Sequence, residues 1–199
     1  MTDSGTTATD GRSARRQRNI DRVLEVVTEM FAEEATLPTM EQVATRSGLS
    51  LRSLYRYFAD PSELFEAAVQ RNAVEGRVVA RIEPLGEGPF EPRLEVLIDS
   101  RIRVHRRFGA TQRATIANAP NQPRARRELA RTRDALRRQM VDQFEPEFAR
   151  LDPAQRPAAE HAADVLTQLE SIDFLRRHLE LSEADAGEVL RTGLRALLT

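Results

Sequence analysis

The sequence contains no cysteine. Disulfides, thiolate nucleophiles, cysteine-zinc sites and thiol redox sensing are therefore excluded. Lysine is also absent, so all 30 basic residues are arginines. No apolar run approaches the roughly 20 residues needed to cross a bilayer. The N-terminal stretch MTDSGTTATDGRSARR lacks the apolar core of a signal peptide. We therefore expect a cytoplasmic protein in which residues 1–14 form a disordered tail.

Catalytic signatures are missing as well. The chain has no HExxH, P-loop, GxSxG or GxGxxG motif, and its predicted helices offer no evident nucleophile or oxyanion hole. The sequence therefore predicts a protein that is not an enzyme and needs no cofactor. One metal-binding alternative exists, since His161 and Asp164 are spaced i, i+3 and Glu170 and Asp173 repeat that spacing. Such pairs are more often a solvated helix face.

Charge is distributed unevenly although the net charge is only −1. Residues 101–138 contain 12 arginines and two acids, whereas residues 139–199 contain 6 arginines and 12 acids. Two explanations remain open for the basic stretch. It binds an anionic ligand, or its arginines form a solvated face in which some pair with the acidic C-terminal helices.

Helical periodicity dominates the chain, and no strand pattern or repeat appears. The apolar pattern predicts a first helix over residues 16–34, followed by shorter helical segments. The stretch 83–93 holds three prolines and two glycines and predicts the domain boundary. We therefore expect an all-α protein with a three-helix N-terminal domain over residues 15–80 and a second helical domain over residues 84–199.

Two short helices after the first one carry clear boundary signals. Thr39 and Gln42 match a capping box, Gly48 is a typical residue after a helix end, and Ser50 is a natural N-cap. This layout over residues 39–58 predicts a helix-turn-helix, whose second helix enters the major groove of DNA.

A helical wheel divides the residues of that second helix into two faces. Leu51, Leu54, Tyr55 and Phe58 fall within about 100° and are predicted to face inward. Tyr55 is expected to place its ring in the core and its hydroxyl at a phosphate, while Tyr57 points outward. The predicted DNA-binding residues are Arg15, Arg16, Arg18, Thr39, Ser50, Leu51, Arg52, Ser53, Tyr55, Arg56 and Tyr57.

Residues 16–76 resemble the DNA-binding domain of the tetracycline-repressor (TetR) family of bacterial regulators. The resemblance is carried by the stretch TMEQVATRSGLSLRSLYRYFADPSELF and the amphipathic helix before it. In that family the fourth helix usually begins with a lysine that contacts a phosphate, and this chain has Pro61 there. The resemblance therefore implies that this contact is lost or supplied elsewhere. Leu51 stands where the family often has a polar residue, which favours apolar contact with a thymine methyl.

The resemblance also implies a C-terminal ligand-binding and dimerisation domain, in which the last two helices pair with a second subunit. Candidate dimer residues are Leu169, Ile172, Leu179, Val189, Leu190, Gly193, Leu194 and Leu197. Candidate ligand-binding residues, several of them polar groups within apolar stripes, are His105, Phe108, Gln112, Gln139, Met140, Phe144, Gln168, Ser171 and Ile172. Each polar one is equally explained as a satisfied core or interface group.

The function implied is that of a homodimeric repressor released from a palindromic operator by a small molecule. Its partners would be double-stranded operator DNA, a second subunit and an unidentified effector. The alternative is a DNA-binding regulator without a small-molecule effector, controlled by a protein partner or by its own expression.

Overall fold

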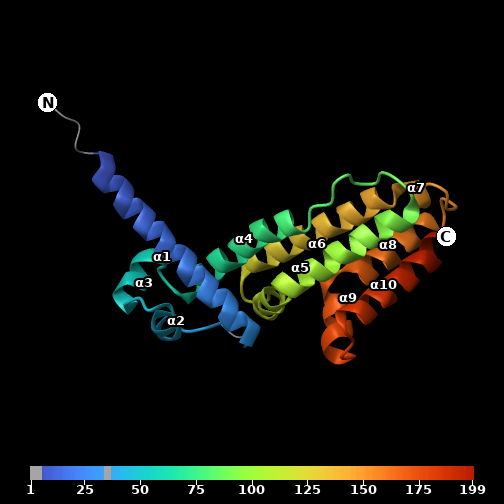
Figure 1. Ribbon diagram of the computed structural model, residues 1–199. Helices are drawn as coiled ribbons and strands as arrows, with labels where there is room; N and C mark the ends of the chain where they lie inside the picture. Colours follow the sequence, from blue (N-terminus) through green and yellow to red (C-terminus); the bar gives the residue numbers. More distant parts are fainter. Residues whose placement is uncertain (1–5, 34–36) are drawn as a thin grey trace. The chain divides into compact units, whose positions relative to one another are not determined.

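The computed structural model describes residues 6–33 and 37–199, and these residues form helices joined by loops, without a strand (Figure 1). The all-α prediction is confirmed. No helix in the described ranges is long and apolar enough to cross a membrane. The helices are α1 (Thr6–Glu33), α2 (Met40–Ser47), α3 (Leu51–Tyr57), α4 (Pro61–Val79), α5 (Phe90–Asn118), α6 (Pro123–Gln143), α7 (Glu145–Phe148), α8 (Arg156–Thr167), α9 (Leu169–Asp173), the π-helical turn η1 (Phe174–His178) and α10 (Glu183–Leu198).

The chain divides into two compact units. Unit 1 comprises the described residues up to Asn72 together with Ala110–Arg126, and unit 2 comprises Ala73–Gly109 and Arg127–Thr199. Helices α4, α5 and α6 each contribute residues to both units. The division between the units therefore differs from the boundary predicted at residues 83–93. The proline-rich segment is a loop, but it connects α4 to α5 within unit 2.

Helix α1 begins at Thr6, ten residues before the start that the apolar pattern predicts. The part of the expected tail from Thr6 to Ala14 is therefore helical, and residues 1–5 lie outside the described residues. The physical reason is that this extension carries small polar residues. A helix without an apolar stripe leaves no periodic signal in the sequence.

The predicted boundary signals of the next two helices are present in the structure. The Thr39 hydroxyl accepts from the backbone N–H of Gln42 at 3.2 Å, and the Gln42 side chain accepts from the N–H of Thr39 at 2.8 Å. Gly48 has φ 72°, a left-handed conformation that glycine adopts without a Cβ penalty. The Ser50 hydroxyl then caps α3 by accepting from the N–H of Ser53 at 3.2 Å. These caps fix the turn between α2 and α3.

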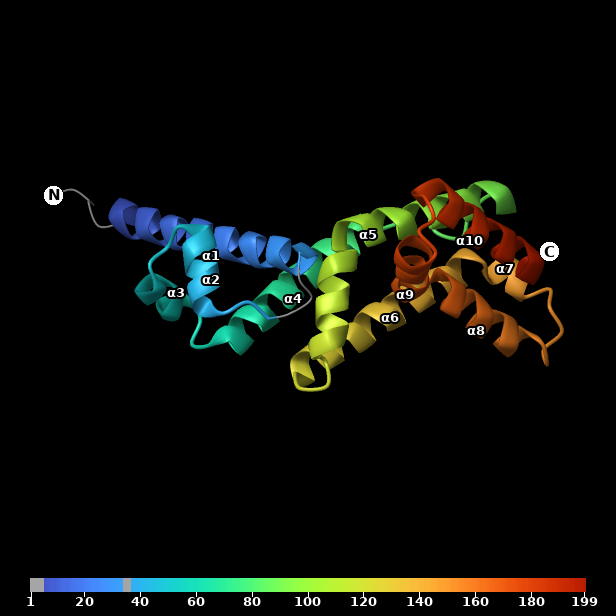
Figure 2. The same cartoon turned by 90° about the horizontal axis from the view of Figure 1, so that it is seen from below.

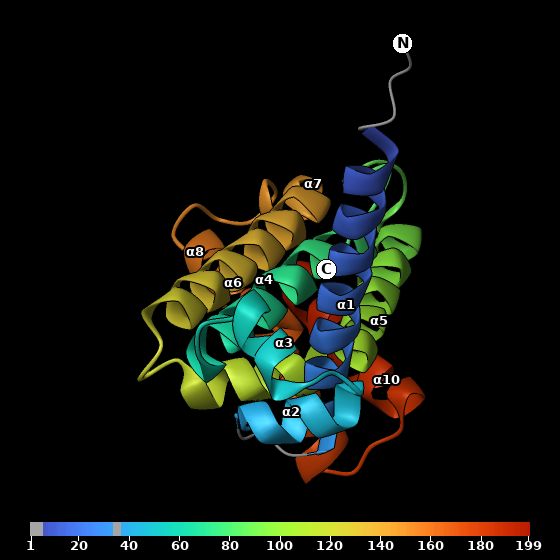
Figure 3. The same cartoon turned by 90° about the vertical axis from the view of Figure 1, so that its left-hand side faces the viewer.

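In unit 1, α2 packs against α1 and α3 packs against α2 (Figures 1 and 3). The rings of Phe31 and Phe65 meet edge to face, with their centroids 5.6 Å apart. Asn72 donates from its side chain to the Thr28 hydroxyl at 3.0 Å, which adds a polar tie between α4 and α1. The buried core of this unit consists of Val23, Leu24, Val27, Phe31, Met40, Val43, Ala44, Leu54, Phe58, Leu64, Phe65, Ala68, Val69, Ala114 and Ala125.

Gly109 lies within a helix, whereas Pro146 lies at the start of one. Helix α5 continues across Gly109 and ends at Asn118. Gly109 does not interrupt it; a Cβ there would lie 3.1 Å from the His105 ring, so glycine permits this close approach. Helix α6 ends at Gln143, and Pro146 lies in the first turn of the separate short helix α7.

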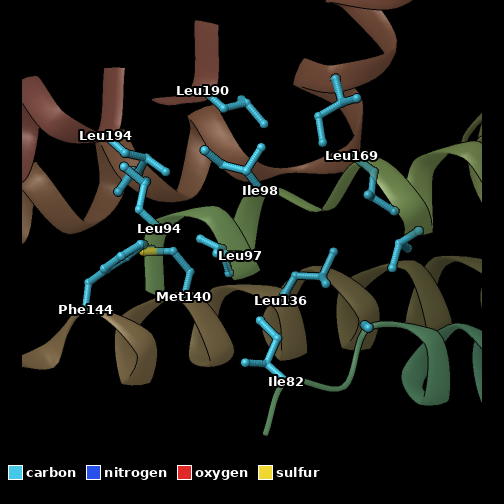
Figure 4. Packing of buried hydrophobic residues seen from close by; sticks show 14 of the residues in the cluster. Ile82, Leu94, Leu97, Ile98, Leu136, Met140, Phe144, Leu169, Leu190 and Leu194 are labelled. Atoms are coloured by element: carbon cyan, nitrogen blue, oxygen red, sulfur yellow. The ribbon is translucent and has the colours of Figure 1, made fainter. Parts of the chain in front are cut away.

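The core of unit 2 is built around α5. Figure 4 shows Leu94, Leu97 and Ile98 of α5 lying between Met140 and Phe144 below and Leu190 and Leu194 above. Helices α8 and α10 pack against each other in the same unit. Ion pairs reinforce the attachment of α10 to α5 at the edge of this core. They are Arg191–Glu95 at 2.6 Å and Arg195–Glu91 at 2.7 Å.

A buried ion pair joins α5 to α7 inside unit 2. Arg93 donates to Glu147 at 2.5 Å, and both side chains are only 5% exposed. Arg93 also donates through Nε to the carbonyl of Gly88 at 3.0 Å and contacts the carbonyl of Gln143. Removing one member of a buried pair leaves the other charge uncompensated, which costs more than the pair itself contributes.

We predict that Arg93→Met lowers the free energy of unfolding by about 3–5 kcal/mol, because Glu147 is left buried without its partner. Urea-induced unfolding followed by circular dichroism measures this difference. The double variant Arg93→Met/Glu147→Met is the matched control and should recover most of the loss. A single variant as stable as the wild type would show that the pair is not buried in solution.

Candidate nucleic-acid interface

The outward face of α3 carries two rows of side chains. Leu51 is 36% exposed and Tyr55 is 48% exposed, and each lies one residue before an exposed arginine, Arg52 or Arg56. Leu54 points inward and is fully buried. The exposed face is therefore basic with one apolar and one phenolic side chain. Arginine can donate to guanine or phosphate, and an apolar side chain can contact a thymine methyl.

The predicted roles of the two tyrosines are wrong and must be exchanged. Tyr55, expected to place its ring in the core, is on the exposed face, while Tyr57, expected to point outward, is half-buried against the unit 1 core. The wheel treated Phe58 as a helical position, but Phe58 has φ −137° and ψ 125° and has already left the helix. The buried side of α3 carries Leu54 with the half-buried Ser53 and Tyr57, and not Leu51 and Tyr55.

The Tyr57 side chain joins α3 to α1. Asn19 of α1 donates to its hydroxyl oxygen at 3.1 Å, and Arg56 donates to the same oxygen at 3.2 Å. The guanidinium carbons of Arg16 and Arg56 lie 5.8 and 5.2 Å from the centre of the ring. The hydrogen bonds from Asn19 and Arg56, with the nearby charges, lower the pKa of Tyr57. This contact sets the rotation of α3 and brings Arg16 close to it.

Helix α1 adds further positive charge beside α3. Arg15, Arg16 and Arg18 are exposed on the N-terminal half of α1, which runs beside α3 within unit 1 (Figure 2). Arg22 is held instead by the carbonyl of Ser47, to which its Nε donates at 3.2 Å. Exposed arginines next to a recognition helix are suited to contact phosphates or the minor groove.

The predicted hydroxyl contacts are located at helix starts. Thr39 and Ser50 are exposed N-caps, and Ser53 is half-buried with its hydroxyl accepting from that of Ser50 at 3.0 Å. A backbone N–H at such a terminus, like a hydroxyl, can donate to a phosphate. These three residues therefore lie at the N-terminal ends of α2 and α3.

Helix α4 begins with a capped turn at the position where the TetR family usually has a lysine. Asp60 accepts from the N–H of Glu63 at 2.8 Å, and the Glu63 carboxylate accepts from the N–H of Ala59 at 2.6 Å. Pro61 is the first residue of the helix, where the absence of an N–H costs nothing. The turn between α3 and α4 is therefore rigidly built, without a cation at its first position.

Among the candidate ligand-binding residues, Met140, Phe144 and Ile172 are fully buried in the unit 2 core, and Phe108 is almost fully buried there. Gln139 bridges two elements: its oxygen accepts from Arg101 at 2.6 Å and its nitrogen donates to the carbonyl of Ala80 at 2.7 Å. Sequence reasoning missed Arg101, which is fully buried. Arg101 is one of 12 arginines in residues 101–138, and nothing in the sequence distinguishes it as the one that points inward.

The remaining polar candidates also have protein contacts. His105 Nε2 lies 3.1 Å from the Asp173 carboxylate, and Gln168 donates to Asp164 at 2.5 Å. Ser171 donates to the carbonyl of Val165. Gln112 belongs to unit 1, and its side-chain oxygen is buried without a hydrogen-bond partner. The structure thus distributes these candidates over α5, α6, the end of α8 and α9.

Four of the candidate dimer residues cannot contact a second subunit, because they are buried in the protomer's own core. They are Leu169, Ile172, Leu190 and Leu194. The other four candidates are more accessible: Leu179 is 49% exposed and Val189 is 39% exposed, while Gly193 and Leu197 are half-buried. A single-sequence apolar stripe does not separate core positions from interface positions, since both are apolar.

The basic stretch forms ion pairs with the acidic C-terminal helices, as one of the two explanations predicts. Arg133 lies 2.5 Å from Glu170, and Arg106 lies 3.4 Å from Glu183. No observation of the structure favours the metal-binding alternative for His161, Asp164, Glu170 and Asp173. Across residues 6–33 and 37–199, no group of three or more His, Asp or Glu side chains is arranged to hold a metal ion.

A capped helix-turn-helix with an exposed basic recognition helix defines a DNA-binding transcriptional regulator. No protein-family model matches the chain. The HTH-type transcriptional regulator BetI of Escherichia coli O17:K52:H18 (strain UMN026 / ExPEC) is 28% identical over 150 residues, 73% of each chain. A TetR-family transcriptional regulator from Streptomyces coelicolor superimposes with a TM-score of 0.73 at 19% identity, covering 91% of this chain and 80% of that one. A TetR transcriptional regulator from Rhodococcus sp. RHA1 is 25% identical, with a TM-score of 0.54 and coverage of 92% and 96%. In fold the chain is like TetR-family transcriptional regulators, and in sequence it is similar to the regulator BetI.

The exchanged roles of the tyrosines give a stability prediction. Tyr57→Phe removes the acceptor for Asn19 and Arg56 and should lower the free energy of unfolding by about 1 kcal/mol. Tyr55→Phe is the matched control and should change it by less than about 0.5 kcal/mol, because that hydroxyl is on the exposed face. Urea titrations of both variants measure the difference. A larger loss of unfolding free energy for Tyr55→Phe than for Tyr57→Phe would instead place Tyr55 in the core and Tyr57 on the surface.

Proposed function

We propose that this regulator is a homodimeric repressor that binds a palindromic operator and is released from it by a small molecule. The observation that carries the proposal is the exposed face of α3, with Leu51, Arg52, Tyr55 and Arg56 presented outward by a helix that is capped at its start. A protein that reads chromosomal operators works in the cytoplasm. The test is whether purified protein prefers the DNA flanking its own gene over random duplex, in a salt-dependent manner.

Two kinds of contact are assigned to the operator. Arg52 and Arg56, with Leu51, would contact base edges, since they occupy the outward side of the recognition helix. Arg15, Arg16 and Arg18, together with the hydroxyls of Thr39, Ser50 and Tyr55, would contact phosphates or the minor groove. Ser53 and Tyr57 act differently, because both are half-buried and hold the helix in place.

Dimerisation is supported by apolar side chains exposed on α8, η1, α10 and the loop before α10. Val165 is 67% exposed and Phe174 is 52% exposed, in addition to Leu179 and Val189. Large apolar side chains left exposed on a protomer are candidates for burial against a partner. One recognition helix contacts few bases, whereas a two-fold dimer reads two half-sites about 34 Å apart.

Release by a ligand requires that the ligand bind one state of the dimer better than the other. A coupling of about 1–3 kcal/mol changes operator affinity about 5- to 150-fold. The alternative, a regulator without a small-molecule effector, is favoured by the complete burial of Met140, Phe144 and Ile172 in the core. A thermal-shift screen of small molecules separates the two, because the alternative predicts no stabilising compound.

Arg52→Ala should weaken operator binding by about 1–3 kcal/mol, because a base contact is lost. Fluorescence anisotropy with a labelled operator and a random duplex of equal length measures this. Arg150→Ala, an exposed arginine of unit 2, is the control and should bind like the wild type. An equal loss on both duplexes would assign Arg52 to a phosphate instead.

Val189→Glu should convert the dimer to a monomer, because a charge would be buried in the proposed interface. Sedimentation velocity at micromolar concentration measures the mass. Val78→Glu is the control, since Val78 is 71% exposed on α4 and lies outside that surface. A Val189→Glu protein that remains dimeric would place the interface elsewhere.

A further inference from the structure

Arg101 of α5 is a charged side chain in the interior of unit 2. It is fully buried; its Nη1 donates to Gln139 at 2.6 Å and its Nη2 donates to the carbonyl of Leu136 at 2.8 Å. Its Nε–H is buried without a hydrogen-bond partner. Burial lowers the pKa of the Arg101 guanidinium to about 10, so the group remains charged at neutral pH.

The charge of Arg101 is compensated less well than that of the other buried arginine. Arg93 makes an ion pair with Glu147 at 2.5 Å. Within the described parts of the chain, Arg101 has no carboxylate at ion-pair distance. Asp164 of α8 acts on it through space, while accepting a hydrogen bond from Gln168. A buried charge without a hydrogen-bonded counterion lowers stability, so its presence requires another explanation.

The surroundings of Arg101 combine polar groups with an apolar wall. Leu136 and Met140 of α6 are buried beside Gln139. The side-chain oxygen of Gln168, next to Asp164, is a second buried polar atom without a partner. Small-molecule sites are typically apolar and contain a few polar groups that orient the ligand. The guanidinium thus donates hydrogen bonds to α6, and the carboxylate of Asp164 on α8 acts on it electrostatically.

We propose that Arg101 binds the carboxylate of a small organic acid, and that this acid is the effector. The proposal rests on the function proposed above and specifies the ligand class. The edge of a guanidinium formed by Nε and Nη matches the two oxygens of a carboxylate, and such charge-assisted hydrogen bonds are short and strong. The acid carries a single negative charge, because Asp164 on the neighbouring helix disfavours a second one.

The test compares acids with their uncharged amides on the full-length protein. Melting temperatures are measured with benzoate, phenylacetate or octanoate, and with benzamide, phenylacetamide or octanamide. At saturation, at least one acid should raise the melting temperature by about 5 °C while its amide does not. The same acid should lower operator occupancy. If none of the three acids stabilises the protein, or if each amide acts as well as its acid, the proposal is overturned.

Two variants separate a binding role of Arg101 from a structural one. Arg101→Met should melt at a higher temperature than the wild type and lose the response to the acid, because an uncompensated charge is removed. Asp164→Asn should bind the acid about five-fold more tightly, since a repulsive charge is removed. If Asp164→Asn instead destabilises the protein and leaves the affinity unchanged, Asp164 is the counterion of Arg101 and the proposal fails.

Operator binding by the wild-type protein without any acid is measured separately. Intact operator binding with no response to acids overturns the assignment of Arg101 and leaves the proposed function standing. Absence of operator binding overturns the proposed function itself.

Discussion

The hydroxyl of Tyr57 is the contact on which the orientation of the exposed basic face of α3 depends. A seven-residue helix has too few backbone hydrogen bonds to be stable alone, so its orientation is set by tertiary contacts. Leu54 anchors α3 in the core, but one buried leucine does not fix rotation about the helix axis. The hydrogen bonds from Asn19 and Arg56 to Tyr57 add the second point of attachment. Once both points are fixed, Leu51, Arg52, Tyr55 and Arg56 are all directed outward.

The same contact explains why part of the interface was predictable and part was not. The capping residues Thr39, Gly48 and Ser50 are local signals, and the structure confirms them because caps depend on residues three or four positions away. The roles of Tyr55 and Tyr57 depend on Asn19, 38 residues before Tyr57 in the chain. No periodicity within α3 contains that information.

In unit 2 the sequence predicted the helices and the core, but not which polar side chains are buried or which partners they have. The apolar stripes of α5, α6 and α10 form the core, since burial follows directly from helical periodicity. Arg93 and Arg101 look alike in the sequence, and both turn inward on α5. Whether a buried arginine finds a carboxylate depends on other helices: Glu147 of α7 pairs with Arg93, whereas Arg101 has no carboxylate at ion-pair distance among the described residues. The basic stretch that includes Arg101 allows an anionic ligand, but which of its arginines is buried follows only from the tertiary arrangement.

The distinction between core and interface follows from the burial of one protomer alone. Leu190 and Leu194 occupy the inner face of α10, and Val189 is on a different face of the same helix. Successive residues on a helix are separated by about 100°, so one apolar segment can serve both a core and a partner only on different faces. Four large apolar side chains, Val165, Phe174, Leu179 and Val189, are exposed on α8, η1, α10 and the loop before α10. The exposed residues, rather than the most apolar ones, are therefore the ones that a second subunit would cover.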